Sequence, residues 1–516
     1  MTNGVQSALS AVASSVNAAP EGVSQTVEAS STVLTLLTGW AGTIDDYVWG
    51  VPLISAIMVT GLILTCFLRF SHLLNLKAAF RYMFHTEEGT AGDVSAFGAL
   101  CTALSATIGT GNIVGVATAI GTGGPGALFW MEVAAFFGMA TKYAEGLLAV
   151  KYREFTPDGR VLGGPFYYIE KGLGKRWKPL AVLFAFFGTL AGIMGIGTIT
   201  QIHGITSAVQ RYFDPGFDPA NAATGLKLLG TTYSVPVVVT GVIVSVCVGL
   251  VVIGGLKRIA KVSMVVVPFM AVFYLVVVAF LLLGNLSKIS SALELIVRSA
   301  FNPSAFTGGM VGTLFVAMQK GVARGIFSNE AGLGSAPIAA AAARTNEPAR
   351  QGLVCMTGTF IDTIVICTMT GLAIVVTGAW EPSLGLKGVD ITIAAFTRGL
   401  AFLGPHSAAL ASFFLMTALT FFAFTTILGW DYYSEKCLEY LVGPHRRVWI
   451  QTYRVLYVAV VFIGPYLTVK LVWDMADIFN GLMAFPNLIA LVLLSPVVAR
   501  TTADFLRRRR LNQVDE

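Results

Sequence analysis

The sequence predicts an all-α integral membrane protein with about eleven transmembrane helices. Charged residues make up only 12% of the 516-residue chain, about half of the roughly 25% that is usual in soluble domains. Hydrophobic residues make up 55%, the mean hydropathy is +0.74, and the apolar residues gather in long runs. No polar stretch between these runs is long enough to form a soluble domain, so the runs themselves must make the fold.

The first 48 residues contain no lysine or arginine. Because a secretory signal begins with basic residues, we expect residues 1–48 to form a flexible external tail instead. The first transmembrane helix is predicted over residues 49–70, which is long enough to cross a hydrocarbon core of about 30 Å. Further spans are predicted around the centres of the remaining apolar runs, at Asn112, Phe137, Gly195, Val246, Phe273, Phe315, Ile364, Thr420, Val458 and Ile489.

Ten predicted spans remain when the first is set aside, and they divide into two groups of five. An odd number of spans gives the two groups opposite orientations in the membrane, as in the inverted repeats of secondary transporters. The first repeat is predicted over residues 93–285 and the second over residues 307–500. Residues 501–516 would then form a basic cytoplasmic tail.

Lysine and arginine residues gather in alternate loops. One set of loops holds most of them, including Lys175, Arg176, Lys178 and the run Arg507–Arg510. The other set holds only Arg211, Lys227, Lys288, Arg298, Lys387, Arg398 and Lys470. Because positive charge marks cytoplasmic loops, we predict a multi-pass protein of the cell (inner) membrane with its amino terminus outside and its carboxyl terminus in the cytoplasm. The arginine run is interpreted as an anchor for lipid headgroups, not as a nucleic-acid site.

Two apolar stretches contain glycines and polar groups where a membrane helix should wind continuously. They are Thr107–Asn112 and Gly321–Gly325. Unpaired peptide groups cost several kcal/mol in hydrocarbon, so two such breaks in corresponding positions indicate the substrate site of a transporter. The alternative is that the glycines only allow close helix packing.

The sequence offers little support for enzymatic chemistry. The six cysteines have no CxxC spacing, the five histidines are scattered, and no HExxH pattern occurs. Gly121–Gly126 matches GxGxxG, but it joins two predicted spans and follows no strand, so we interpret it as a turn. Without a Walker lysine pattern or converging catalytic groups, the chain is predicted not to be an enzyme and not to use ATP.

Three motifs resemble the signatures of the alanine/glycine:cation symporter family. They are Gly109–Val116, Gly163–Ile169 and Phe327–Pro337, and the resemblance extends over about residues 50–500. Membership implies a LeuT-type fold, in which the two inverted repeats of five helices are preceded here by one extra span. It also implies sodium-coupled symport of small neutral amino acids, alanine or glycine, with Na⁺ as the coupling ion.

Residues at the first interruption are candidates for binding an amino acid. Free N–H groups at the start of a helix suit a carboxylate, and this selects Thr110, Gly111 and Asn112. Unwound carbonyl groups around the second interruption, at Gly321, would suit the ammonium group.

Three further residues are candidates for the walls of the same pocket. Gln201 is similar in position to a polar residue on the carboxylate side of related transporters, and its alternative role is a hydrogen bond between helices. Phe315 and Phe421 could close the pocket over a small side chain, although aromatic residues in spans commonly serve packing alone.

The family resemblance also matches residues to sodium sites, since sodium prefers oxygen ligands. Thr425 and Thr426 would supply hydroxyl groups to one ion. The carbonyl groups that complete this site would come from Ser105, Ile108 and Phe422. A second ion is matched to the Asn112 side chain and the Thr107 carbonyl. The alternative for the threonine hydroxyls is a bond to the backbone of their own helix.

Three ionisable residues lie inside predicted spans. For Asp362 we favour an ion pair with Arg324 or Lys320, because a buried unpaired carboxylate is costly. Lys142 and Glu145 lie three residues apart on one helical face and are expected to form an ion pair.

Two other functions fit the same residues. One is a proton-coupled amino-acid transporter that uses Asp362, and the other is a sensor or channel on the same fold that couples no uptake. The predicted partners are a small amino acid and the lipid bilayer, with no nucleic acid. The sequence carries no prediction of the oligomeric state.

Overall fold

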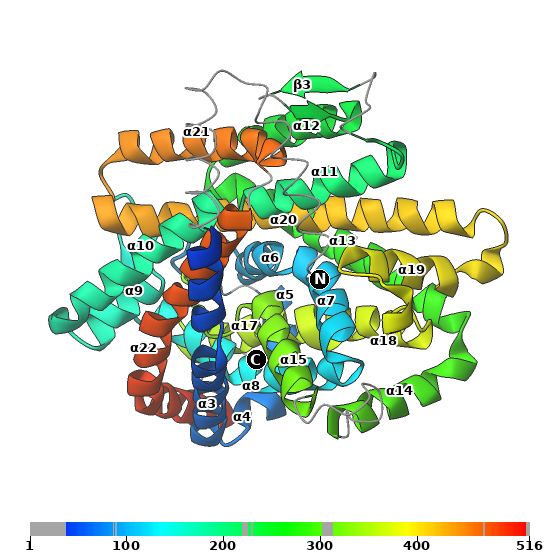
Figure 1. Cartoon of the computed structure of the whole chain (residues 1–516). Helices are drawn as coiled ribbons and strands as arrows, with labels where there is room; N and C mark the ends of the chain where they lie inside the picture. The colour runs from blue at the N-terminus through cyan, green and yellow to red at the C-terminus, as the bar shows by residue number, and fades with distance from the viewer. Residues whose placement is uncertain are drawn as a thin grey trace.

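The computed structural model describes residues 38–85, 87, 90–218, 225–228, 231–301, 313–467 and 470–511. Over these residues the chain is almost entirely helical, with two short β-hairpins in its loops (Figure 1). Within this part of the chain, nine helices are long and apolar enough to cross a membrane, and ten if one bent pair counts as a single span. The predicted class of all-α membrane protein is therefore confirmed.

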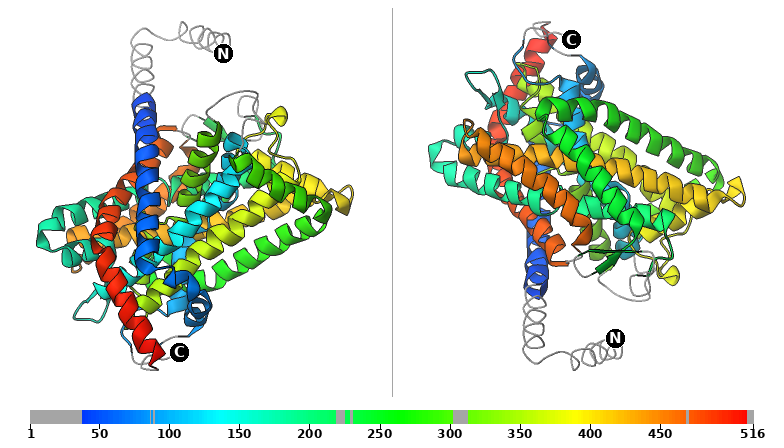
Figure 2. Two further views of the ribbon diagram at one scale, coloured as in Figure 1. Left: turned by 90° about the horizontal axis from the view of Figure 1, so that it is seen from below. Right: turned by 90° about the horizontal axis from the view of Figure 1, so that it is seen from above.

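The first predicted span begins earlier than expected. A helical segment covers Thr38–Leu68, whereas the sequence predicted a start at residue 49, and residues 1–37 lie outside the described residues. A turn at Trp49 and Gly50 separates its first part from α3 (Val51–Leu68). The left view of Figure 2 shows α3 beside α22 (Lys470–Arg510), which is the last helix of the described chain.

Helices occupy every predicted span of the first half, residues 93–285. Ahead of this half lie α4 (Ser71–Leu74) and α5 (Leu76–Phe84). The half contains α6 (Ala96–Thr107), η1 (Thr110–Asn112), α7 (Val114–Gly123), α8 (Gly126–Lys151), α9 (Pro165–Tyr167), η2 (Tyr168–Gly172), η3 (Lys175–Trp177), α10 (Lys178–Met194), α11 (Ile199–Phe213), α12 (Val235–Val252) and α13 (Leu256–Leu283). Two antiparallel hairpins, which the sequence analysis did not predict, pair β1 (Glu154–Phe155) with β2 (Val161–Leu162) and β3 (Leu226–Leu228) with β4 (Thr231–Tyr233).

Helices also occupy the predicted spans of the second half, whose first residues, 307–312, lie outside the described ranges. After α14 (Leu286–Phe301) come α15 (Thr313–Asn329), α16 (Ala336–Ala340), α17 (Pro348–Thr359), η5 (Phe360–Cys367), α18 (Thr368–Val376), η6 (Pro382–Leu384), α19 (Val389–Gly399), η7 (Ala401–Leu403), α20 (Ser407–Val442), α21 (Arg447–Ile463), η8 (Gly464–Tyr466) and α22. The predicted span around Phe315 is α15, which has 17 residues. Because α22 extends to Arg510, the predicted tail begins as helix.

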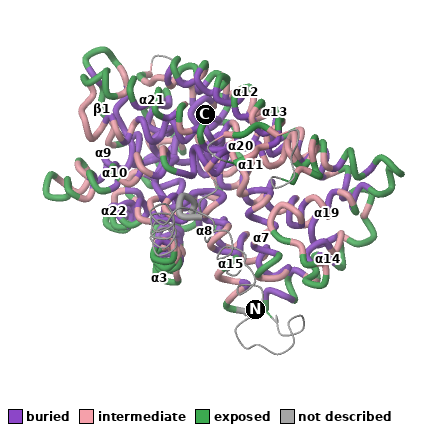
Figure 3. The backbone as a smooth tube through the Cα atoms, turned by 45° about the horizontal axis from the view of Figure 1, so that its top comes forward, coloured by how far each residue is buried: buried purple, intermediate pink, exposed green. Residues whose placement is uncertain are grey.

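The helix α8 lies at the centre of the fold. In its most apolar stretch 83% of the residues are buried, compared with 33% in α13. α15 and α7 lie side by side and pack against α8, and α17 and α3 also contact it (Figure 1). Buried residues therefore fill the middle of the molecule, and exposed ones lie on the outer helices (Figure 3). The exposed residues of α13 include Val265, Phe269 and Val272, the apolar surface expected of a helix that faces lipid.

The first predicted interruption is present, but the second is displaced. α6 and α7 meet at an angle of 62° across Ile108 and Gly109. By contrast, α15 is continuous through Gly321–Gly325, so the prediction of a break there is wrong. A Cβ atom on Gly321 would lie 2.2 Å from the Ala127 carbonyl oxygen of α8. These glycines therefore serve close helix packing, the alternative considered for them.

The helix that begins with α15 is interrupted farther along, between Asn329 and Ala336. Three residues there have positive φ angles: Glu330 (56°), Gly332 (90°) and Gly334 (82°). A left-handed backbone conformation is permissive for glycine and strained for other residues, so this stretch ends α15 before α16 begins. The break thus falls within the Phe327–Pro337 motif.

Candidate functional site

The interruption between α6 and α7 is held by contacts from two other helices. The Asn112 side chain accepts a hydrogen bond from the Gly109 N–H (2.9 Å), and the Thr426 hydroxyl of α20 donates to the Ile108 carbonyl (3.3 Å). Gly109 is required for this approach, because a Cβ atom there would lie 2.6 Å from the Thr426 hydroxyl oxygen. The break is therefore a specific structure with buried polar support.

A cavity of about 730 Å³ leads to this break, a volume within the usual range for small-molecule sites. It is bounded by parts of α7, α11, α15, α19, α20 and α22. Its lining residues include the predicted site residues Thr110, Gly111 and Gln201. Arg211 of α11 and Asp390 of α19 form an ion pair among the lining residues at its exposed end.

Gln201 has an unused acceptor inside the protein. Its side-chain nitrogen donates to the Ile196 carbonyl (3.0 Å), in the unwound turn between α10 and α11 that the sequence analysis did not predict. Its side-chain oxygen is buried and has no hydrogen-bond partner among the described residues. A buried unpaired acceptor is costly, so this oxygen is available to a donor group of a bound molecule.

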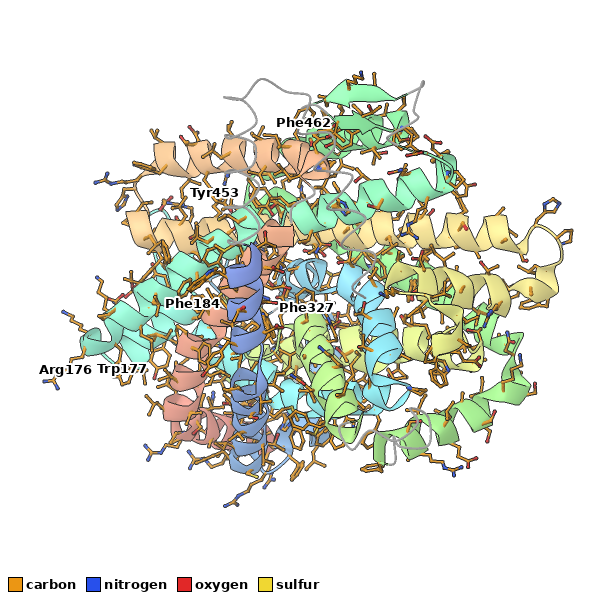
Figure 4. The ribbon with its side chains drawn as sticks, viewed as in Figure 1. Arg176, Trp177, Phe184, Phe327, Tyr453 and Phe462 are labelled. Carbon is orange, nitrogen blue, oxygen red and sulfur yellow. The ribbon has the colours of Figure 1, made fainter. Side chains whose placement is uncertain are left out.

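Phe327 of α15 stands against the break (Figure 4). A Cβ atom on Gly111 would lie 3.6 Å from the Phe327 ring, and the Arg324 guanidinium lies 5.4 Å from the ring centroid. Arg324, Phe327 and Asp477 of α22 all line the cavity. Phe327 is the first residue of the motif Phe327–Pro337, but its position at the cavity was not predicted from the sequence.

Four of the candidate substrate-site residues do not line the cavity. Asn112 is one of them: it is fully buried at the break. The other three lie elsewhere. Phe315 is 47% exposed, and Phe421 packs against Phe269 with ring centroids 5.4 Å apart. Gly321 lies within continuous helix against α8, as described above. The structure therefore brings none of these three residues to the interruption at Gly109.

The candidate sodium ligands separate into two groups. The Thr426 hydroxyl lies 3.3 Å from the Ile108 carbonyl and 3.0 Å from the Phe422 carbonyl, so three predicted ligands meet. The other hydroxyls bond to their own helices: Thr425 to the carbonyls of Phe421 and Phe422, Ser105 to that of Thr102, and Thr107 to those of Ala103 and Leu104.

Asn112 contacts a second group of polar residues around Asp362. The Asn112 amide donates to one carboxylate oxygen of Asp362 (2.7 Å), and the hydroxyls of Ser328 and Thr363 donate to the other (both 2.8 Å). Asp362 is fully buried and lies in the π-helical segment η5, a type of distortion that is frequent at functional sites. Among the described residues Asp362 forms no ion pair with Arg324 or Lys320, contrary to the prediction. Its carboxylate oxygens accept the hydrogen bonds just described instead, and Arg324 lies over Phe327 at the cavity.

Polar contacts continue around the second interruption. Glu330 accepts hydrogen bonds from the Trp430 ring nitrogen (3.0 Å) and from the Ser335 hydroxyl. Glu145 of α8 accepts from the Gly332 N–H (3.2 Å) and from the Asn487 amide (2.7 Å). These bonds replace those that a continuous helix would have made.

The expected ion pair between Lys142 and Glu145 is not among the ion pairs of the described residues. The Lys142 ammonium is buried and has no hydrogen-bond partner within the described ranges. One carboxylate oxygen of Glu145 accepts instead from the Gly332 N–H and the Asn487 amide, and its other oxygen has no hydrogen-bond partner among the described residues.

One arginine, Arg153, connects the segment before α6 with the segment after α16. The Arg153 guanidinium, after α8, donates to the carbonyls of Ala341 (2.8 Å), Ala343 (2.6 Å), Thr345 (2.5 Å) and Ala91 (3.0 Å). These carbonyls belong to the segment after α16 and to the segment before α6. Arg153 thereby links the start of the first interrupted helix, at α6, to the end of the second, at α16.

A broken membrane helix that lines a cavity, as Thr110 and Gly111 do here, is typical of membrane transporters. The profile of the sodium:alanine symporter family matches residues 34–516, and the chain belongs to that family. The resemblance inferred from the three motifs is thereby confirmed, and the family is one of transporters rather than enzymes.

Relatives span nearly the whole chain. An uncharacterized transporter of Haemophilus influenzae is 51% identical over 92% of this chain and 97% of its own length. The sodium/alanine symporter AgcS of Methanococcus maripaludis is 46% identical over 91% of this chain and 97% of its own. A putative sodium/proton-dependent alanine carrier protein of Bacillus subtilis, YrbD, is 35% identical over 92% and 93%, respectively.

Proposed function

We propose that this protein imports alanine or glycine together with sodium by alternating access around the interruption between α6 and α7. The observation that carries the proposal is the cavity of about 730 Å³ that reaches Thr110, Gly111 and Gln201 at this interruption. The names of two relatives, a sodium/alanine symporter and an alanine carrier, support this choice of substrate.

A zwitterionic amino acid fits the groups at the base of the cavity. Its carboxylate would meet the backbone N–H groups and the positive helix end near Thr110 and Gly111. Its ammonium group would donate to the unpaired side-chain oxygen of Gln201. Phe327 leaves room only for a small side chain, because its ring already stands against Gly111.

The first sodium would lie at the crossing of α20 and the α6 end. Ile108 and Phe422 would supply carbonyl oxygens, which lie 3.3 Å and 3.0 Å from the hydroxyl oxygen that Thr426 would supply. Uncharged oxygen donors suit a hard monovalent cation. Ser105 and Thr425 stay candidate ligands on the flanks of this site.

The second sodium would lie near Asn112, with Thr107 as the further predicted ligand. Asp362 and Ser328, which contact Asn112 in the buried cluster described above, extend this candidate site. A fully buried carboxylate needs a compensating positive charge or a proton. A sodium ion would supply that charge, which is why the cluster supports a second ion.

The proposed cycle uses a LeuT-type pair of inverted repeats, residues 93–285 and 307–500, after one extra helix. With the amino terminus outside, the cavity opens outward, because it runs toward the ends of α7 and α11 that precede external loops. The Arg153 contacts then lie on the cytoplasmic side and hold it closed. An inward membrane potential adds about 2.3 kcal/mol per charge per 100 mV to uptake.

Uptake of radiolabelled alanine by the purified protein in liposomes tests this function. We expect saturable uptake that requires an inward sodium gradient and stops when choline replaces sodium at fixed pH. Uptake that persists in choline and follows a proton gradient would favour the alternative of proton coupling through Asp362. Charge flow without saturation or exchange would favour a channel.

A further inference from the structure

The helix that precedes the ten predicted core spans contacts two residues of the cavity wall, and it does so at Trp49. Its ring nitrogen donates to the Asp477 carbonyl of α22 (2.9 Å). Its ring meets that of Phe327 in a T-shaped contact, with centroids 6.3 Å apart. Trp49 itself does not line the cavity, whereas Asp477 and Phe327 both do.

The same helix packs closely enough to fix this contact. A Cβ atom on Gly481 of α22 would lie 2.4 Å from the Val48 side chain and 3.1 Å from the Trp49 ring nitrogen. One helical stretch farther along, Ile57 lies against Gly332 at the second interruption, at 3.3 Å from a Cβ atom placed there. The extra helix therefore contacts the last turn of α15 at Phe327 and the second interruption at Gly332, and it packs along α22 (Figure 2).

Trp49 contacts two residues of the cavity wall: Phe327, which supplies an aromatic ring, and Asp477, which supplies a carboxylate. The Arg324 guanidinium lies over Phe327, and its charge acts on the Asp477 carboxylate. Asp45, one helical turn before Trp49, also acts on Asp477. Trp49 thus contacts the Phe327 ring with its own ring and the Asp477 carbonyl with its ring nitrogen, and both of these residues line the cavity.

We infer that the extra amino-terminal helix positions the wall of the substrate cavity that Phe327 and Asp477 form, with Trp49 as the positioning residue. This inference rests on the proposed function, because that wall would close over the amino acid proposed to bind at Thr110 and Gly111. A T-shaped ring pair and a partly buried hydrogen bond each contribute enough to change affinity severalfold. Without them, closure over alanine is less favourable, while the sodium sites at Thr426 and Asn112 are untouched.

The test compares two substitutions of Trp49 in the purified, full-length protein in liposomes. Trp49→Phe keeps a ring for Phe327 but removes the N–H donor, and it should raise the KM for alanine about fivefold. Trp49→Ala removes both contacts and should raise the KM about tenfold or more. The sodium concentration for half-maximal uptake should stay within about twofold of wild type. Trp40→Ala is the matched control, because Trp40 lies on the same helix and is 70% exposed.

Closure is measured separately through a cysteine at Ser207, which lines the cavity. In a background without the exposed residues Cys66 and Cys247, alanine should protect Ser207→Cys from an impermeant maleimide, and Trp49→Ala should weaken that protection. The inference is overturned if Trp49→Ala leaves both the KM for alanine and the protection of Ser207→Cys unchanged. It is also overturned if kcat falls while the KM is unchanged, because that pattern indicates a purely structural role. If Trp49→Ala does not fold, Trp49→Phe decides by the same criteria. A wild-type protein without sodium-dependent uptake would instead overturn the proposed function.

Discussion

The two helix interruptions differ in how their peptide groups are satisfied. At the first, Thr110 and Gly111 line the cavity of about 730 Å³. At the second, buried side chains complete the bonds: the Asn329 side chain accepts from the Ala331 N–H (2.9 Å), and the Asn487 amide donates to the Gly332 carbonyl (2.9 Å). The first interruption is thus available to a ligand, whereas the second is closed by the protein itself.

Under the proposed function, this difference gives the two interruptions different roles: the first binds the substrate and the second takes part in the conformational change. The backbone of Thr110 and Gly111, which lines the cavity, would be the part of the first interruption that meets the substrate carboxylate. At the second interruption, the hydrogen bonds to Glu330 and Glu145 hold the chain between α15 and α16 in one conformation. In the proposed cycle, a movement of these helices would have to break or exchange those bonds. Under the proposed cycle, the first sets affinity for the substrate and the second sets how readily the cavity changes sides.

The largest effect is expected at the first interruption, from Asn112→Ala. The substitution removes the acceptor for the Gly109 N–H and the donor to Asp362, so both the break and the buried carboxylate lose a partner. Leaving such groups unpaired costs about 1–3 kcal/mol each, more for charged groups. Sodium-driven alanine uptake in liposomes should be abolished. Normal kinetics in this variant would remove Asn112 from the site, and size-exclusion chromatography in detergent controls for folding.

The next effect concerns sodium and separates two adjacent hydroxyls. The double substitution of Thr425 and Thr426 by alanine should sharply raise the sodium requirement. Of the single substitutions, Thr426→Ala should raise the sodium concentration for half-maximal uptake about tenfold, since one ligand is worth on the order of 1.4 kcal/mol. Thr425→Ala should have the smaller effect, because that hydroxyl bonds to its own helix and to the Met270 sulfur.

Thr426→Ser is the conservative control in this series, because it restores the hydroxyl group. An unchanged sodium dependence in the double variant would count against the hydroxyl site at the first interruption.

At the second interruption, Asn487→Ala should change turnover rather than affinity. The substitution leaves the Gly332 carbonyl and the Glu145 carboxylate each without one donor, which costs about 1–3 kcal/mol in the arrangement seen here. We expect kcat for alanine to change severalfold while its KM stays within about twofold, measured by initial rates of uptake. Asn285→Ala is the matched control, because Asn285 bonds to two carbonyls far from both interruptions. A large rise in KM would contradict the division between the two regions.

Much of the fold could be predicted because hydrophobic runs and loop charges report directly on membrane spans. The residues at Thr107–Asn112 could also be identified, since two glycines and an asparagine in an apolar run have few other uses. The contacts of Asn112 with Asp362 could not, because they join residues 250 positions apart and depend on the packing of α15 and η5.

The error at Gly321 has a physical cause. A glycine in an apolar run either permits an unwound backbone or permits a neighbouring helix to approach, and the sequence pattern is the same in both cases. The break lies a few residues farther along the chain, where two closely spaced glycines, Gly332 and Gly334, follow Asn329 by three and five residues and both adopt positive φ angles. Phe315 precedes the stretch Gly321–Gly325, where the break was wrongly predicted, whereas Phe327 lies next to the break that the structure shows.

The smallest effect on transport is therefore expected at Gly321. In Gly321→Ala the new methyl group would lie 2.2 Å from the Ala127 carbonyl oxygen, so α15 and α8 must move apart. Overpacking of this kind costs about 1–3 kcal/mol, and the melting temperature should fall while the KM for alanine stays within about twofold. Gly249→Ala in α12 is the matched control, since the nearest atoms there are 3.6 Å away and alanine favours helix by up to about 1 kcal/mol. A rise in the KM for alanine with an unchanged melting temperature would return Gly321 to the binding site.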